Sequence, residues 1–446
     1  MKMMDGNCST KEAKTESLYF KTQRGTMTVD NKLHVLVVGA GFGGLGCAIA
    51  CKRQGFDVTV FDKVAKFAPI GDSIGFGCNS ARLLKRWGLL DDMLPLCSKV
   101  KLATIHDYTG KLLATDPSQG DAEEEFGVPS LIGHRGHLHQ IMLDHAAKLG
   151  VDVRPGSEVV DYDSAKPSII LKSGQEITGD VVVVADGVRS VGKTAVLGYH
   201  DKPQHSGYAV WRAFADGTAL RDDPLVQNLV KNDSLGLWIG PDIHALALSF
   251  DGGSLINMGV THKDDADIEE GWRVPAKKED VMELIRDWDP AYKKLWEHTP
   301  PENILDWKLV YRPCLEKWVS DTGLVTITGD AAHPFLPSSS QGASQAIEDG
   351  ATIALCLAKA ASKANIPLAL HTFFEIRYEH VAAAQHMGIE QRDEWHHNHE
   401  DGQLTNTPDF SKGMLKTRSL WGHDAEKVVE EEWDAKSALA REKYGV

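Results

Sequence analysis

Short apolar runs alternate with longer helical stretches in two parts of the chain. The runs cover residues 35–38, 58–61, 181–184 and 324–328. Nearly continuous apolar runs of this length are typical of strands that are buried on both faces of a parallel sheet. They predict an α/β domain in which helices cover the two faces of such a sheet.

The middle of the chain has a different pattern. Short strands separated by turns are predicted at 208–214, 235–239, 245–250 and 255–260. Strands that follow one another through short turns predict an antiparallel sheet. A helix is expected at 279–287. After Asp349 the pattern is helical to the end, with breaks at 365–367 and 399–410.

These patterns divide the chain into four parts. The predicted fold class is α/β, with a Rossmann-like nucleotide-binding domain, an inserted antiparallel-sheet domain and a helical C-terminal region. We place the nucleotide domain at 33–204 and 308–375, the inserted antiparallel-sheet domain at 205–307 and the helical region at 376–446. Residues 1–32 are polar and lack the apolar segment of a signal peptide, so they are expected to form a disordered leader.

A glycine fingerprint follows the first apolar run. Gly39, Gly41 and Gly44 form a GxGxxG sequence, and Asp62 ends the next predicted strand about 20 residues later. The glycines allow a tight turn and the close approach of a pyrophosphate, and the acid can hold ribose hydroxyls. The fingerprint predicts a dinucleotide site without separating FAD from NAD(P).

Two later acids also follow apolar runs. Asp186 follows 181–184, and Asp330 follows 324–328 before a loop rich in Pro and Ser leads to a helix that opens at Gly342 and Ala343. Ligands of open α/β sheets lie at the carboxyl ends of the strands. An acid there can bind the hydroxyls of a ribityl chain, and the unpaired N–H groups of the helix N-terminus can face a pyrophosphate or a flavin.

In this order, the segments resemble those of class A flavoprotein monooxygenases, single-component FAD enzymes related to p-hydroxybenzoate and salicylate hydroxylases. Asp330 lies in the segment that resembles the GD motif of the family, and Asp186 in the one that resembles its DG motif. Arg135 lies in a segment similar to the one whose arginine approaches the flavin. Residues 420–426 resemble the fungal branch that contains salicylate-hydroxylase-like and alkaloid-oxidising enzymes.

The resemblance implies a cofactor and a chemistry. FAD would be bound noncovalently, and NADPH or NADH would dock transiently as the electron donor. O2 would then form a flavin C4a-hydroperoxide that oxygenates an aromatic or indole ring of a specialised metabolite. The residues implied in cofactor binding are Gly39, Gly41, Gly44, Asp62, Gly75, Arg135, Asp186, Asp330, Gly342 and Ala343.

Two further residues are candidates for catalysis. Arg212 lies in a strand that resembles the family strand with an arginine beside the substrate, and alternation puts Tyr208, Val210 and Arg212 on one face. Asp72 lies in 70–75, which resembles the segment that passes beside the flavin ring, and fungal indole-oxidising members are similar in having Asp there. The alternatives are an arginine at the sheet surface and an aspartate that caps its own turn.

Composition narrows the range of partners. The formal net charge is −15 and no run of Lys or Arg relieves it, which argues against nucleic acid and anionic membranes as partners and against stable membrane insertion. Seven scattered cysteines indicate reduced thiols and a cytoplasmic protein. Cys47 and Cys51 are expected to pack against the sheet. We predict no metal site, and interpret His396, His397 and His399 as part of a solvated loop.

Other functions remain open at this point. One is a salicylate-type phenol hydroxylase, although Leu248 stands where relatives that hydroxylate phenols often have Tyr. Another is an FAD dehydrogenase or oxidase that inserts no oxygen. A third is a flavin-binding protein without catalytic activity, which the intact glycines and acids argue against.

Overall fold

The computed structural model describes residues 32–68, 72–163, 165–201, 204–264, 274–396, 399–400, 403–404 and 410–446. The predicted leader lies outside these residues except for Lys32. No helix in the described part is long and apolar enough to cross a bilayer. The cytoplasmic location stays a prediction.

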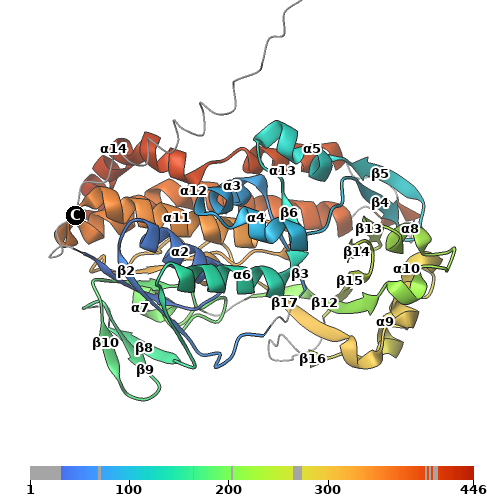
Figure 1. Cartoon of the computed structure of the whole chain (residues 1–446), viewed down its shortest axis with the longest axis horizontal. Helices are drawn as coiled ribbons and strands as arrows, with labels where there is room; N and C mark the ends of the chain where they lie inside the picture. The colour runs from blue at the N-terminus through green and yellow to red at the C-terminus, as the bar shows by residue number, and fades with distance from the viewer. Residues whose placement is uncertain are drawn as a thin grey trace, which may run out of the picture.

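A five-stranded parallel sheet forms the base of the nucleotide domain (Figure 1). All four residues of β11 are buried valines, because the strand lies in the interior of the sheet between β18 and β1. The predicted parallel α/β domain is therefore confirmed. In sheet order the strands are β18 (Val325–Ile327), β11 (Val181–Val184), β1 (His34–Val38), β2 (Asp57–Asp62) and β7 (Asp152–Pro155).

Helices α2 (Phe42–Arg53) and α11 (Gly342–Ala360) cross at close range in this domain. A Cβ atom at Gly350 would lie 2.5 Å from the backbone nitrogen of Cys47, so the crossing requires a glycine. Cys47 and Cys51 are buried on α2, and both are free thiols. They lie in the packed interior, as expected from the small residues of this helix.

Helix α6 (Arg135–Lys148) begins at Arg135. Strand β6 (Leu131–His134) runs directly into it and pairs with β3 (Ser73–Phe76). The backbone N–H of Arg135 donates to the carbonyl of Asp72 at 2.8 Å. The first helical turn is therefore tied to the loop that carries Asp72.

An eight-stranded sheet forms the second domain (Figure 1). It contains every strand that we predicted between 205 and 260. In sheet order the strands are β16 (Val274–Pro275), β17 (Leu305–Tyr311), β12 (Gln204–Asp216), β15 (Leu255–Lys263), β14 (Ile243–Phe250), β13 (Leu235–Gly240), β4 (Ala103–Asp107) and β5 (Leu112–Asp116).

Two features of this sheet differ from the expectation. Strand β13 pairs with β4 in parallel, so the sheet is mixed, not purely antiparallel. Strands β4 and β5 come from a part of the chain that we assigned to the nucleotide domain. Strand β4 pairs with the edge of β13, which would otherwise leave a row of backbone groups without partners, and β5 pairs with β4.

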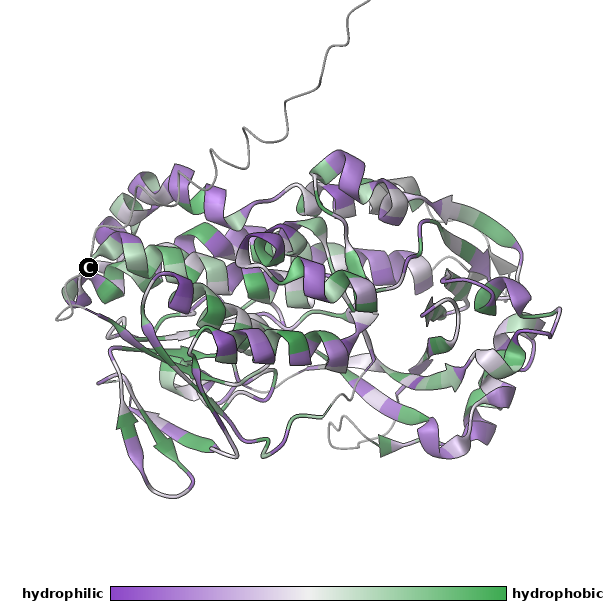
Figure 2. Cartoon of the chain, in the orientation of Figure 1, coloured by the Kyte–Doolittle hydropathy of each residue, from purple (hydrophilic) through white to green (hydrophobic). Residues whose placement is uncertain are grey.

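One face of the large sheet packs on helices α9 (Lys278–Leu284) and α10 (Pro290–His298). Trp238 and Met258 lie in this core beside Tyr292. The ribbon of these strands and helices carries hydrophobic positions (Figure 2), and their buried residues form one cluster. Helix α9 was predicted, and α10 was missed although Asp289 caps it by accepting the N–H of Ala291 at 2.9 Å.

The C-terminal part is helical, as predicted. Helix α12 begins at Ile366, with Pro367 in its first turn, so it crosses the predicted boundary at 376. Between 399 and 410 the structure describes two short paired strands, β19 (His399–Glu400) and β20 (Gln403–Leu404). The longer C-terminal helices are α12 (Ile366–His396), α13 (Phe410–Trp421) and α14 (Ala425–Tyr444).

The remaining elements are short. Strands β8 (Val159–Asp163), β9 (Ser168–Leu171) and β10 (Glu176–Thr178) form a separate sheet at one end of the molecule (Figure 1). The other helices are α3 (Cys78–Trp87), α4 (Leu90–Met93), α5 (Ser118–Phe126), α7 (Lys193–Leu197) and α8 (Gln227–Val230).

Candidate active site

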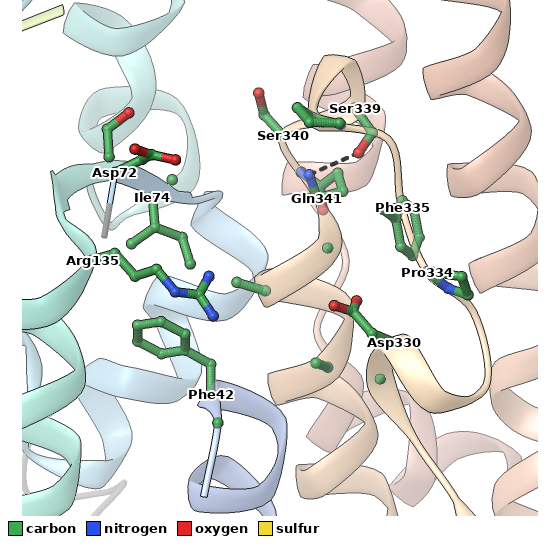
Figure 3. Close-up of a pocket in the computed structure, with 18 of the residues that line it drawn as sticks. Phe42, Asp72, Ile74, Arg135, Asp330, Pro334, Phe335, Ser339, Ser340 and Gln341 are labelled. Atoms are coloured by element: carbon green, nitrogen blue, oxygen red, sulfur yellow. Dashed lines mark hydrogen bonds between the residues drawn. The ribbon is translucent and has the colours of Figure 1, made fainter. Parts of the chain in front are cut away.

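A cavity of about 1120 Å³ lies between the two sheets and brings together most of the predicted site residues. Figure 3 shows Asp72, Arg135 and Phe42 on one side of it and Asp330 on the other. Gly44 is the exception, because it is buried behind the glycine loop. The predicted residues that line the cavity are Gly39, Gly41, Asp62, Asp72, Gly75, Arg135, Asp186, Arg212, Asp330, Gly342 and Ala343.

The glycine loop has the shape that a pyrophosphate needs. Gly39 has φ +100°, and a Cβ atom there would lie 2.2 Å from the carbonyl oxygen of Ala185. A Cβ atom at Gly44 would lie 1.9 Å from the carbonyl oxygen of Gly39, so both glycines are required by backbone packing. A Cβ atom at Gly41 would meet nothing within 4 Å. Gly41 therefore borders open space at the uncapped N-terminus of α2.

Asp62 closes this part of the site at the end of β2. Its carboxylate accepts the N–H groups of Ala40 and Val64, both at 2.7 Å. His139 Nε2 donates to the carbonyl of Ala40 at 2.6 Å, and burial lowers the pKa of His139. The carboxylate is thus oriented toward the loop, and its remaining lone pairs can accept ribose hydroxyls.

The opposite wall is formed by the segment between β18 and α11. Asp330 is exposed to the cavity, while the surrounding protein desolvates it and raises its pKa against the opposing effect of His333 and Arg135. No side chain among the described residues caps the N-terminus of α11 at Gly342. The same ligand can therefore contact the carboxylate of Asp330 and the N–H groups of the first turn of α11 on this wall.

Arg135 lies between the two walls. Its guanidinium is 5.3 Å from the ring centroid of Phe42, and in Figure 3 it points across the cavity. Burial lowers the pKa of Arg135, and the charges of Asp330 and Asp72 partly oppose this effect. Arg135 therefore presents a cation to the cavity, and its contact with a flavin ring stays a prediction.

The side chain of Asp186 accepts hydrogen bonds from the backbone of the turn that follows β11. Its Oδ2 accepts the N–H of Val191 at 3.0 Å and that of Gly192 at 3.5 Å, which holds the turn after β11. Its buried Oδ1 has no protein donor among the described residues, and burial raises its pKa. A direct contact with the cofactor stays a prediction.

Arg212 and Asp72 form an ion pair inside the cavity. Arg212 is 7% exposed and its guanidinium lies 5.2 Å from the ring centroid of Trp307. The pair joins the large sheet to the loop that was expected beside the flavin. Of the three residues expected to share this face, only Arg212 lines the cavity, because Tyr208 packs on the ring of His396 at 4.7 Å.

Asn257 is a residue that sequence reasoning missed. It lies on β15, is 3% exposed, and its Oδ1 accepts the hydroxyl of Ser73 at 2.7 Å. Its Nδ2 donates to the carbonyl of Ala213 at 3.3 Å. Asn257 therefore fixes the Asp72 loop against the strand that carries Arg212.

The rest of the cavity forms an apolar chamber beneath the large sheet. Leu237, Leu246 and Leu248 project into it from neighbouring strands, and the equivalence of Leu248 to the Tyr of phenol-hydroxylating relatives stays a prediction. Helices α12 and α13 close the opposite side, and their lining residues are Gln391, Glu394, Trp395, Phe410, Gly413, Thr417 and Trp421. The chamber can hold an aromatic ring next to the Arg212–Asp72 pair.

A buried ionic network supports α11 behind the site. Arg377 of α12 donates to Glu348 at 2.7 Å and to Asp349 at 2.9 Å, and His333 lies 2.6 Å from Asp349. Burial would raise the pKa of Asp349, but His333 and Arg377 hold it at about 2. The sequence pattern did not reveal this role of Glu348 and Asp349, because their partners Arg377 and His333 lie elsewhere in the chain.

The expectation for the C-terminal histidines is wrong in part. His396 is 1% exposed and its Nε2 lies 2.7 Å from Nδ1 of His244 on β14. It therefore packs on the large sheet instead of lying in a solvated loop, because α12 extends as far as His396. His397 lies outside the described residues, and of His399 the structure describes the strand β19.

In the part of the chain that the structure describes, the glycine loop opens directly into the chamber with no second nucleotide domain between them, and this arrangement fits the resemblance to class A flavin monooxygenases. Known proteins are similar to the chain in sequence and in fold. Residues 32–386 match the family model for an FAD binding domain. The chain belongs to this family of FAD-dependent monooxygenases.

Curated fungal enzymes are similar over most of the chain. Asperlicin C monooxygenase of Petromyces alliaceus is 34% identical over 81% of this chain and 80% of its own length. The FAD-dependent monooxygenase notI of Aspergillus sp. is 33% identical over 90% of this chain and 92% of its own length. FAD is accordingly the cofactor.

Solved structures share the fold. CtdE in complex with FAD and a substrate superimposes with a TM-score of 0.81 at 28% identity, covering 92% of this chain and 99% of CtdE. A salicylate hydroxylase substrate complex has a TM-score of 0.74 at 21% identity, covering 92% and 98% of the two chains. The second likeness shows the fold alone.

Proposed function

We propose that this enzyme uses NAD(P)H and O2 to oxygenate an aromatic or indole ring of a specialised metabolite. The observation that carries the proposal is the Arg212–Asp72 ion pair, which lies in the same cavity as the glycine loop and Asp330. The names of fungal relatives, asperlicin C monooxygenase among them, support a small secondary metabolite as the substrate.

The residues at the cofactor end of the cavity fit FAD. Asp62 would hold the adenosine ribose, the loop at Gly41 the pyrophosphate, and Asp330 the ribityl chain, while Arg135 would lie against the flavin ring. When bound, FAD supplies the activation of O2 with electrons from NAD(P)H. We propose that it is held noncovalently.

The chain itself positions the ring and excludes water. Arg212 can donate to a carbonyl or ring oxygen through its planar fork, and Asp72 can accept an indole N–H. Asn257 would keep the Asp72 loop in register with Arg212. The leucines of the sheet limit the access of water to the reacting atoms. Less activated oxygen is then lost to side reactions before it reaches the substrate.

Oxygen labelling tests the proposal. The FAD-loaded enzyme is incubated with NADPH or NADH under 18O2 and a panel of indoles and phenols that includes salicylate, and products are analysed by mass spectrometry. One 18O atom in an indole or other aromatic product supports the proposal. Peroxide with unlabelled, dehydrogenated product would establish an oxidase instead, and selective conversion of salicylate would establish the phenol-hydroxylase alternative.

A further inference from the structure

His244 is the polar residue among the cavity-lining positions of β14, a strand of the chamber wall. Strand β14 alternates, so that Leu246 and Leu248 also line the cavity while Ala245 and Ala247 lie in the core on the other face. The side chain of His244 therefore faces the chamber.

The end of α12 holds this imidazole in place. Nδ1 of His244 lies 2.7 Å from Nε2 of His396, and the ring of Trp395 packs edge-on against it at 5.0 Å. Burial, with a contribution from Arg392, lowers the pKa of His244 to about 4, so the ring is neutral at pH 7. Because the hydrogen bond to His396 uses Nδ1, Nε2 is the nitrogen left for a ligand.

The charges of the chamber argue against an anionic ligand. Arg212 is the only Lys or Arg among the described cavity-lining residues of the large sheet, α12 and α13, and Asp72 already neutralises it. Arg135 also lines the cavity, where the negative charges of Asp330 and Asp72 act on it. Glu394 of α12 and Asp116 of β5 add negative charge to the lining. A carboxylate that entered would lose its hydration without gaining an unpaired cation, which is costly in an apolar cavity.

We propose that the chamber selects uncharged aromatic ligands that carry an amide or a similar neutral hydrogen-bonding group. His244 contacts this group, and the closed Arg212–Asp72 pair excludes carboxylates. The inference rests on the proposed function, because it refines the substrate class of the same site.

Matched pairs of ligands test this selectivity. The full-length, FAD-loaded protein is titrated at pH 7.0 with indole-3-acetamide and indole-3-acetate, and with salicylamide and salicylate, while the flavin absorbance is followed. In each pair the two members have nearly the same size and differ in charge. The amide is expected to bind at least about tenfold more tightly, as loss of an ion's hydration outweighs one neutral hydrogen bond.

Two variants separate the contributions. His244→Ala should weaken binding of the amides roughly 3- to 10-fold, the worth of a neutral hydrogen bond, and leave the acids unchanged. Asp72→Asn keeps the size of the side chain but frees the charge of Arg212, so the acids should gain at least about tenfold relative to the amides. His298→Gln, on the exposed end of α10, is the matched control and should change neither.

The outcomes are distinguishable from those of the oxygenation test. Three results would overturn the inference. The unaltered protein binds the acids as tightly as the amides or more tightly, it binds none of the four ligands, or Asp72→Asn keeps the preference of the unaltered protein. If His244→Ala loses FAD, the Asp72→Asn comparison still decides. Labelled product without amide preference refutes the selectivity alone, whereas amide preference without oxygen insertion refutes the proposed function alone.

Discussion

Replacing Arg212 by alanine would break the ion pair on which the site assignment depends. Arg212 is 7% exposed and pairs with Asp72, whose side chain is 25% exposed. Removing one partner of a buried pair typically costs 3–5 kcal/mol, and the partial exposure of Asp72 favours the lower end, about 3 kcal/mol of unfolding free energy. The cation–π contact with Trp307 is lost in the same substitution.

The effect on chemistry should be larger than the effect on cofactor binding. Arg212 belongs to the large sheet and not to the glycine loop, so Arg212→Ala should retain FAD. A charge-assisted hydrogen bond to the substrate is worth about 1.5–3 kcal/mol, or roughly a 10- to 150-fold loss of product formation. Arg212→Lys keeps the charge but not the planar fork of donors. Its rate of product formation should therefore lie between those of the unaltered enzyme and Arg212→Ala.

Transient kinetics distinguishes a role of Arg212 in positioning the substrate ring from a role in binding FAD. Flavin reduction by NADPH is measured anaerobically, and product and H2O2 are measured in air. In Arg212→Ala we expect reduction to persist while product falls and H2O2 rises, because the ring is no longer held. Coupled turnover near that of the unaltered enzyme would refute the assignment of Arg212, and loss of FAD from the variant would place it in the cofactor site.

The parallel nucleotide domain was predictable because its signals are local. The valines of β11 form a continuous buried run, and Gly39 and Gly44 are fixed by backbone contacts that leave no room for a side chain. A proline at 367 marks the beginning of α12 at Ile366. In each case the residue type is determined by neighbours close in sequence or by a single close contact with the backbone.

The edge of the large sheet was not predictable in the same way. Strand β4 has the half-polar sequence Ala-Thr-Ile-His-Asp and pairs with β13, more than a hundred positions later in the chain. Neither strand contains a turn signal that joins it to the other. Such a pairing is decided by the long-range path of the chain, and not by periodicity.

The site was predicted in its parts but not in its connections. The resemblance singled out Arg212 and Asp72, and the structure pairs them. Asn257 and His244 were missed because each looks like an ordinary strand residue. Their importance comes from the register of β14 and β15, which places one against Ser73 and the other against His396. No spacing along the sequence reports that register.

Three further changes test separate contacts. Asp330→Ala should purify with much less FAD than a surface variant, judged by the ratio of flavin to protein absorbance. Asp62→Ala should weaken FAD without switching the preference between NADH and NADPH, since we place the ribose of FAD there; a clean switch would assign the loop to the nicotinamide nucleotide. The third prediction concerns the loss of folding stability at low pH. His244 has a folded-state pKa of about 4 against an ordinary value of 6.5, so the unfolded chain binds more protons between these values. The stability present above pH 6.5 is therefore lost as the pH falls toward 4, by about 2 kcal/mol at pH 5. Urea unfolding at pH 7 and pH 5 should show a correspondingly smaller loss in His244→Gln, and equal losses in both proteins would contradict burial of a neutral ring.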